Sequence, residues 1–159
     1  MNICELKHDD FGIYSICNIF QSDDFVLNVD SSFVGYFNVY NFLHSLSIGN
    51  SIAFGCFSQD DLDFPDGLVF GDIVDNTFEV HFAFVGKINM AKKIKLLQMV
   101  IELIKQNYPF IEKIVGYPPE EYKHARLLIR KLGFVESETN IKLVGLNDLK
   151  QCVKVEYKY

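Results

Sequence analysis

The chain has 159 residues, of which 49% are apolar and 23% charged, and its net charge is −6 at pH 7. This length and composition are typical of one domain with its own core and exclude an intrinsically disordered chain. No apolar run is long enough to span a membrane, and the first residues lack the features of a signal peptide, so we expect a single cytoplasmic domain over residues 1–159 with no membrane partner.

The first fifty residues predict one short strand and two helices. A strand is indicated at 3–7, and either aspartate at 9–10 can cap a helix that ends near residue 20. Residues 30–32 offer N-caps for a second helix over 33–46. The aromatic residues of this second helix are Phe33, Tyr36, Phe37, Tyr40 and Phe42. They are expected in the core, and a surface for a protein partner is the alternative.

The next segment predicts an antiparallel meander. Strands are expected at residues 51–57, 68–74 and 77–85. Residues 59–67 are rich in Asp, Pro and Gly and form the first connection, while Asp75 and Asn76 form a tight turn. In the third strand, Phe and Val alternate with polar residues, so Glu79 and His81 share one face of the strand.

Helices and strands alternate in the rest of the chain. Four apolar residues from Leu97 to Ile104 are spaced i, i+3, i+4 and i+7, which indicates a helix that ends before Pro109. Strands are expected at residues 113–116, 135–144 and 152–157. Residues 118–121 are a helix entry, and Gly133 favours a left-handed cap at the end of that helix.

Charge is distributed unevenly along the chain. Residues 1–85 carry one Lys and thirteen Asp or Glu, whereas residues 86–131 carry ten Lys or Arg and four Glu. A basic segment inside an acidic chain indicates a local site for an anion, such as the phosphates of a nucleotide-like cofactor. The acidic segment would repel a nucleic-acid backbone, so no nucleic-acid partner is expected.

The cysteines are scattered and lack the spacing of a metal site. They are Cys4, Cys17, Cys56 and Cys152. Reduced and mostly buried thiols are therefore expected, with no metal cofactor. Serine–histidine and phosphate-loop patterns are also absent from the sequence, and neither His44 nor His124 suggests a function.

The predicted order, β-α-α-β-β-β-α-β-α-β-β, favours an α/β (α+β) fold with a mixed, mostly antiparallel twisted sheet flanked by helices. It resembles the order of the GNAT N-acetyltransferases. The spacing from Ala125 to Gly133 and Phe134 is similar to the family's late helix, and residues 78–85 resemble its central strand. The Glu-Val-His segment at 79–81, together with Gly55 and Cys56, resembles segments of acetyltransferase-like proteins of tailed phages.

The resemblance implies that acetyl-CoA lies between the central strand and the next strand, with its pyrophosphate at the start of the long helix. Lysines cluster at that start, and backbone N–H groups at 84–85 would hold the thioester carbonyl. The expected cofactor-binding residues are Phe84, Val85, Lys87, Asn89, Ala91, Lys92 and Lys93. A solvated helix start is the alternative interpretation of these lysines.

The resemblance also indicates which residues would carry the chemistry. Glu79, with His81 or an ordered water, would take a proton from an attacking amine, whether on a small molecule or a protein. The Tyr that protonates the leaving thiolate in the family falls on Ile129, so Tyr122 is the substitute candidate. The alternatives are a half-exposed polar strand for Glu79 and His81 and a packing role for Tyr122.

The chain departs from the family where the phosphates would bind. The family's loop, Q/R-x-x-G-x-G/A, falls on Ile88, Ala91 and Lys93, or on Asn89 in a second register, without its glycines. Two functions follow as hypotheses. The first is an N-acyltransferase that uses acetyl-CoA. The second is a non-catalytic assembly or binding protein of the same fold, with a protein partner and a place in the host cytoplasm or a phage particle.

Overall fold

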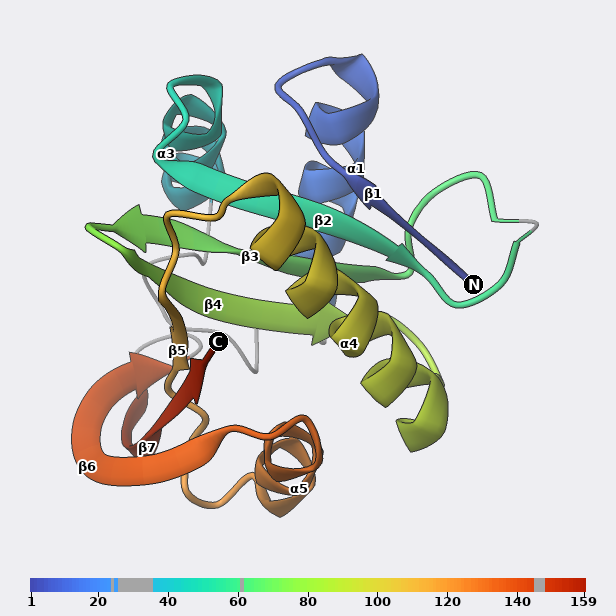
Figure 1. The fold of residues 1–159 in the computed structure, drawn as a ribbon. Coiled ribbons are helices and arrows are strands. Elements are labelled where there is room, and N and C mark those ends of the chain that lie inside the picture. The colour runs from blue at the N-terminus through green and yellow to red at the C-terminus, as the bar shows by residue number, and fades with distance from the viewer. Residues whose placement is uncertain (24, 26–35, 61, 145–147) are drawn as a thin grey trace.

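The computed structural model describes residues 1–23, 25, 36–60, 62–144 and 148–159. Its described helices and strands follow the predicted order (Figure 1). The strands are β1 (Asn2–Glu5), β2 (Ser51–Phe57), β3 (Gly67–Val74), β4 (Thr77–Phe84), β5 (Lys113–Gly116), β6 (Val135–Val144) and β7 (Asp148–Lys158). The helices are α1 (Asp10–Phe20), α3 (Tyr36–Ser47), α4 (Met90–Asn107) and α5 (Lys123–Lys131).

The described strands form one seven-stranded sheet in the order β1-β2-β3-β4-β5-β7-β6. All neighbours pair antiparallel except β4 and β5, which are parallel. A parallel pair needs a crossover connection, and the long helix α4 provides it. The α/β fold with a mixed, mostly antiparallel sheet is therefore confirmed.

Apolar core clusters cover both faces of the sheet. Figure 1 shows α4 across one face and α1 with α3 on the other. The first core joins α4 residues such as Leu97 and Ile104 to Phe54 and Phe78 of the sheet. The second joins α1 and α3 to the opposite face, where Phe70 is fully buried. Side chains of β4 alternate between the two cores, as the sequence pattern predicts.

Capping residues fix the helix ends near the predicted positions. Asp9 caps α1 by accepting a hydrogen bond from the Gly12 N–H at 2.8 Å. Gly133 has a φ of +94°, the left-handed conformation expected after α5. The predicted N-caps at 30–32 and the first part of the helix predicted over 33–46 lie outside the described residues.

The entry to α5 differs from the prediction. Residues 118–121 precede the helix, because Pro119 forms a bridge with Cys152 of β7 and the Glu120 N–H donates to the Gln151 carbonyl at 2.7 Å. These contacts leave Glu120 and Glu121 in a turn, and the helix begins at Lys123. Pairing with β7 thus overrides a local helix-start signal.

The thiols are less uniformly buried than predicted. Cys56 and Cys152 are buried, whereas Cys4 and Cys17 are only partly buried, and none of these four described cysteines forms a disulfide. Burial raises the pKa of the Cys4, Cys17 and Cys56 thiols.

No described helix has the length and apolarity that crossing a membrane requires.

The sheet opens between β4 and β5. The two strands pair only at Thr77–Lys113, Phe78–Ile114 and Glu79–Val115. After Glu79, the remaining residues of β4 continue their pairing with β3, while Gly116 at the end of β5 pairs with Val155 of β7. The ends of the two parallel strands therefore separate, and this gap is where the site lies.

Candidate functional site

A cavity of about 570 Å³ lies at the gap between β4 and β5. Its walls come from the end of β4, the middle of α4, the end of β5, α5 and the connection that leads into α5. Val80 and Phe82 contribute from the α4 face of the sheet, whereas His81 contributes from the face that carries α1 and α3. The cavity is thus lined from both faces of the sheet.

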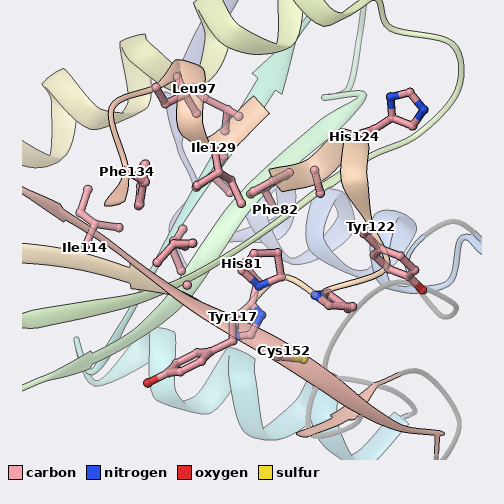
Figure 2. Close-up of a pocket in the computed structure, with 18 of the residues that line it drawn as sticks. His81, Phe82, Leu97, Ile114, Tyr117, Tyr122, His124, Ile129, Phe134 and Cys152 are labelled. Atoms are coloured by element: carbon pink, nitrogen blue, oxygen red, sulfur yellow. The ribbon is translucent and has the colours of Figure 1, made fainter. Parts of the chain in front are cut away.

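The two ends of the cavity differ in chemistry. Figure 2 shows the apolar side chains of Leu97, Ile114, Ile129 and Phe134 gathered toward one end. Around the other end lie side chains that carry polar atoms. They are His81, Tyr117, Tyr122 and Cys152. A long, mostly apolar ligand with a polar reacting group would fit such a lining.

Glu79 contacts a lysine from a distant strand. The Lys142 ammonium of β6 donates to Glu79 Oε1 at 3.0 Å and lies 3.6 Å from the centre of the Tyr117 ring. Both charged side chains are partly buried, with exposed fractions of 26% for Lys142 and 35% for Glu79. Lys142 and Tyr117 line the cavity, so the carboxylate of Glu79 reaches the cavity through Lys142.

Tyr122 lies in the cavity wall at the N-terminus of α5. Its hydroxyl oxygen accepts a hydrogen bond from the Lys150 ammonium at 3.1 Å, and Lys150 also pairs with Glu121. The hydrogen bond to Glu121, with a smaller contribution from the hydrogen bond to Tyr122, raises the pKa of the Lys150 ammonium. In this hydrogen bond the Tyr122 oxygen is the acceptor, so the bond does not use the phenolic proton.

His81 follows Glu79 on the same face of β4, as predicted. Its ring stacks on Phe70 with 5.5 Å between ring centres, and the residue lines the cavity. His81 from β4 and Tyr122 from the α5 entry therefore line the same cavity. Glu79 joins this group through its contact with Lys142.

The predicted phosphate-binding residues lie at the start of α4. Asn89 caps the helix, and its side chain accepts a hydrogen bond from the Lys92 N–H at 2.9 Å. The Lys92 ammonium donates to the Ser58 carbonyl at 3.2 Å, and the Lys93 ammonium lies 5.3 Å from the centre of the Phe84 ring. Lys87 and Ala91 are exposed. The cavity lining, as far as the structure describes it, includes none of the predicted cofactor residues.

The two backbone amides predicted to hold the thioester carbonyl point to opposite edges of β4. The Val85 N–H donates to the Asp66 carbonyl at 2.8 Å, in the direction of β3. Successive N–H groups of a strand point to opposite edges, so the Phe84 N–H points to the edge that faces the gap. Of the two predicted amides, only that of Phe84 has the direction needed to meet a carbonyl group there.

Sequence reasoning missed Lys142, and it placed Tyr117 beside the late helix entry without assigning it a role. They are separated by 24 intervening positions, and neither belongs to a pattern that indicates chemistry. A bulge between Glu136 and Thr139 interrupts the register of β6, and Figure 1 shows this strand bending strongly. The bent strand places Lys142 beside Glu79 of β4. Local sequence signals do not reveal this contact.

An ion pair ties α5 to β6 beside the cavity. Glu136 accepts from Arg126 at 2.9 Å and from Arg130 at 2.8 Å. The hydrogen bonds from Arg126 and Arg130 lower the pKa of Glu136 from 4.5 to about 2. These two ion pairs therefore tie α5, which carries the cavity residues Ala125 and Ile129, to β6.

The pKa of Glu136 predicts an acid-sensitive contribution to stability. Its folded pKa lies below the unfolded value, so the ionised carboxylate stabilises the fold above about pH 4.5 and loses this effect as the pH falls toward 2. We expect Glu136→Gln to reduce the free energy of unfolding near neutral pH, with a difference from wild type that shrinks below pH 4.5. Urea unfolding at several pH values measures this difference. Glu138→Gln, at an exposed partner of Lys154, is the control, and a pH-independent difference for Glu136→Gln would contradict the prediction.

Within the described residues, no group of three or more His, Cys, Asp or Glu side chains is arranged to hold a metal ion. No protein-family model and no curated protein sequence matches the chain.

Solved structures do match over nearly the whole chain. Ribosomal-protein-S5-alanine acetyltransferase from Vibrio fischeri has a TM-score of 0.73 at 11% identity, covering 98% of this chain and 91% of its own. Spermidine N-acetyltransferase from Vibrio cholerae, solved as a mutant, has a TM-score of 0.73 at 15% identity, covering 99% and 92%. AAC(6')-Ib, in complex with ribostamycin and coenzyme A, has a TM-score of 0.71 at 12% identity, covering 99% and 92%.

These similarities concern the fold. Two of the three proteins come from Vibrio, and nothing among them supports the expected similarity to phage proteins. Three observations indicate the same fold. They are the gap between β4 and β5, the helix α4 that joins these strands, and the matches to solved structures over nearly the whole chain. This chain has the fold of the GNAT N-acetyltransferases.

Proposed function

We propose that the protein is an N-acyltransferase that moves an acyl group, acetyl in the simplest case, from acyl-CoA to an amine. The observation that carries this proposal is the cavity at the gap between β4 and β5, which is lined by His81, Tyr122 and Lys142, the last paired with Glu79. The structural neighbours add support, because they are acetyltransferases and one of them was solved with coenzyme A.

The donor would enter along the apolar part of the cavity. The pantetheine arm would lie between β4 and α5, and the Phe84 N–H would point toward the gap that holds the thioester. The phosphates would lie near the start of α4, where Lys92 and Lys93 add positive charge to a helix N-terminus. The Lys92 N–H already donates to the Asn89 side chain. The ammonium groups of Lys92 and Lys93 would therefore contribute more to phosphate binding than the Lys92 backbone amide does.

The acceptor amine would approach from the polar end. Glu79, directly or through His81, would take the proton from the amine, which would then attack the thioester carbonyl. A carbon–nitrogen bond would form, the carbon–sulfur bond would break, and Tyr122 would protonate the leaving thiolate. The second proton lost by the nitrogen would restore the Tyr122 hydroxyl. Lys150 supports this role, because its ammonium donates to the Tyr122 oxygen and so does not take the phenolic proton.

Calorimetric titration with acetyl-CoA tests the cofactor part of the proposal, with desulfo-CoA as a non-reacting ligand. We expect micromolar binding that weakens with salt. The double variant Lys92→Gln/Lys93→Gln should weaken binding about tenfold, which corresponds to about 1.4 kcal/mol. The matched control is Lys105→Gln/Lys131→Gln, which removes two lysines from the far ends of α4 and α5.

The outcome separates the two hypotheses from the sequence. An unchanged affinity in the Lys92/Lys93 variant would remove the phosphate-binding assignment. No binding at millimolar acetyl-CoA would overturn the acyltransferase proposal. The fold would then serve as a binding or assembly module, and copurification of a protein partner would be the next measurement.

Tyr122→Phe tests the acid role. We expect the rate of acyl transfer to an amine to fall about tenfold with KM nearly unchanged, since a thiolate with a pKa of about 8.5 needs only modest assistance to leave. Release of free CoA thiol measures the rate. Tyr14→Phe, at an exposed tyrosine of α1, is the control. A change in KM alone would indicate that Tyr122 contributes to binding and not to proton transfer.

A further inference from the structure

We infer that Lys142 is itself an acyl acceptor, so that the protein acylates its own lysine at this position. The inference rests on the proposed function and names one amine that the site can reach. It starts from the position of the Lys142 ammonium, which lies where the ammonium of an external amine would be expected, beside the carboxylate of Glu79.

Three contacts place Lys142 at the reacting end of the cavity. Its ammonium donates to Glu79 Oε1 at 3.0 Å, it lies 3.6 Å from the centre of the Tyr117 ring, and the residue forms part of the cavity wall. Glu79 belongs to the last residue pair between β4 and β5 before these strands separate. The amine is therefore held at the start of the gap in which the thioester would lie.

The surroundings of Lys142 resemble those of a bound amine substrate. A carboxylate and an aromatic face are the groups that recognise an alkylammonium ion. Lys142 is also only 26% exposed, so its long side chain is restrained and not free in solvent. Ordering an amine beside the reacting carbonyl converts a bimolecular step into an intramolecular one.

The proposed reaction balances in atoms and charge. The Lys142 ammonium gives one proton to Glu79, and its neutral nitrogen attacks the thioester carbonyl of acyl-CoA. A carbon–nitrogen bond forms, the carbon–sulfur bond breaks, and the second proton of the nitrogen passes to the leaving thiolate. The products are an amide at Lys142 and free CoA thiol. The ion pair with Glu79 is lost, because an amide carries no charge.

Lys154 provides a matched control within the same sheet. It is 22% exposed and forms ion pairs with Glu138 at 3.1 Å and with Glu156 at 3.2 Å. It therefore has the same charge, a similar burial and two carboxylate partners, but the described cavity lining does not include it. A difference in acylation between Lys142 and Lys154 would report on position in the cavity and not on general lysine reactivity.

The experiment is incubation of the full chain with acetyl-CoA, followed by peptide mass spectrometry that quantifies acetylation at every lysine. We expect acetylation of Lys142 to exceed that of Lys154 by at least about tenfold, at a rate independent of protein concentration. Acetyl phosphate, which needs no CoA site, should modify both lysines to similar extents. Lys142→Arg should remove the acetyl group gained in the intact mass, while Lys154→Arg should not.

Glu79→Gln adds a test of the proposed proton acceptor. This variant should reduce acetylation of Lys142 without changing that of Lys154. If calorimetry shows acetyl-CoA binding but Lys142 is acetylated no faster than Lys154, this inference is overturned while the proposed function stands. If acetyl-CoA does not bind, both fail, so the titration distinguishes the two failures.

Discussion

Phe70→Ala is expected to lower the free energy of unfolding by about 3–5 kcal/mol, the range for removing a large aromatic ring from a well-packed core. Phe70 is fully buried in the core between the sheet and helices α1 and α3. Its ring lies 5.1 Å from that of Phe20, 5.4 Å from that of Phe42 and 5.5 Å from that of His81, between ring centres. The alanine variant would lose these contacts, and that with the Phe25 ring at 5.7 Å, and leave a cavity in their place.

Urea unfolding followed by circular dichroism measures this effect through the transition midpoint at constant m-value. The loss is large because small domains are stable by only about 5–15 kcal/mol. Phe110→Ala is the control, since that ring is 51% exposed and should change stability by less than about 0.5 kcal/mol. A loss below about 1 kcal/mol for Phe70→Ala would mean that the aromatic cluster is loosely packed.

Strong local patterns made much of the fold predictable. The apolar run at 51–57 is bounded by turn residues, and the strand matches the prediction residue for residue. The helix α4 shows an equally clear period, and the turn at Asp75 has a positive φ of 52°, a conformation that Asp tolerates better than most residues. In each case the signal lies within a few neighbouring residues.

The errors arose where distant residues decide the local structure. The Pro-Pro-Glu-Glu sequence at 118–121 has the composition of a helix start, but it forms a bridge and a turn held by contacts with β7. The last strand was predicted to begin at Cys152, yet pairing with β6 extends it to polar residues from Asp148 onward. Ladder hydrogen bonds, and not side-chain patterns, set that boundary.

The candidate site was predictable in part. The alternation of β4 predicted that Glu79 and His81 share a face, and the fold resemblance pointed to Tyr122, which lies in the cavity wall. The contact between Glu79 and Lys142 was not predictable, because it joins residues of two strands that are not neighbours in the sheet. A contact of this kind depends on the bend of β6, which requires the three-dimensional structure.

Ala125→Trp is expected to abolish acetyl-CoA binding, with a loss of affinity of at least about a hundredfold, or about 2.8 kcal/mol. Ala125 is a small residue on α5 in the wall of the cavity, opposite the strand that carries Val80 and Phe82. An indole group there would occupy space that the pantetheine arm needs. The substitution should not destabilise the fold, because the new side chain enters an existing cavity and not a filled core.

Leu127→Trp is the matched control, since Leu127 lies on the same helix, is 45% exposed and is absent from the described cavity lining. Calorimetric titration of both variants, with thermal unfolding to verify the fold, gives the comparison. The result also separates the two parts of the cofactor site. If Ala125→Trp binds acetyl-CoA normally while Lys92→Gln/Lys93→Gln binds weakly, the cofactor is held at the start of α4 but its arm does not enter the cavity. Acyl transfer at Glu79 and Tyr122 would then lose its structural basis, because the thioester could not reach the gap between β4 and β5.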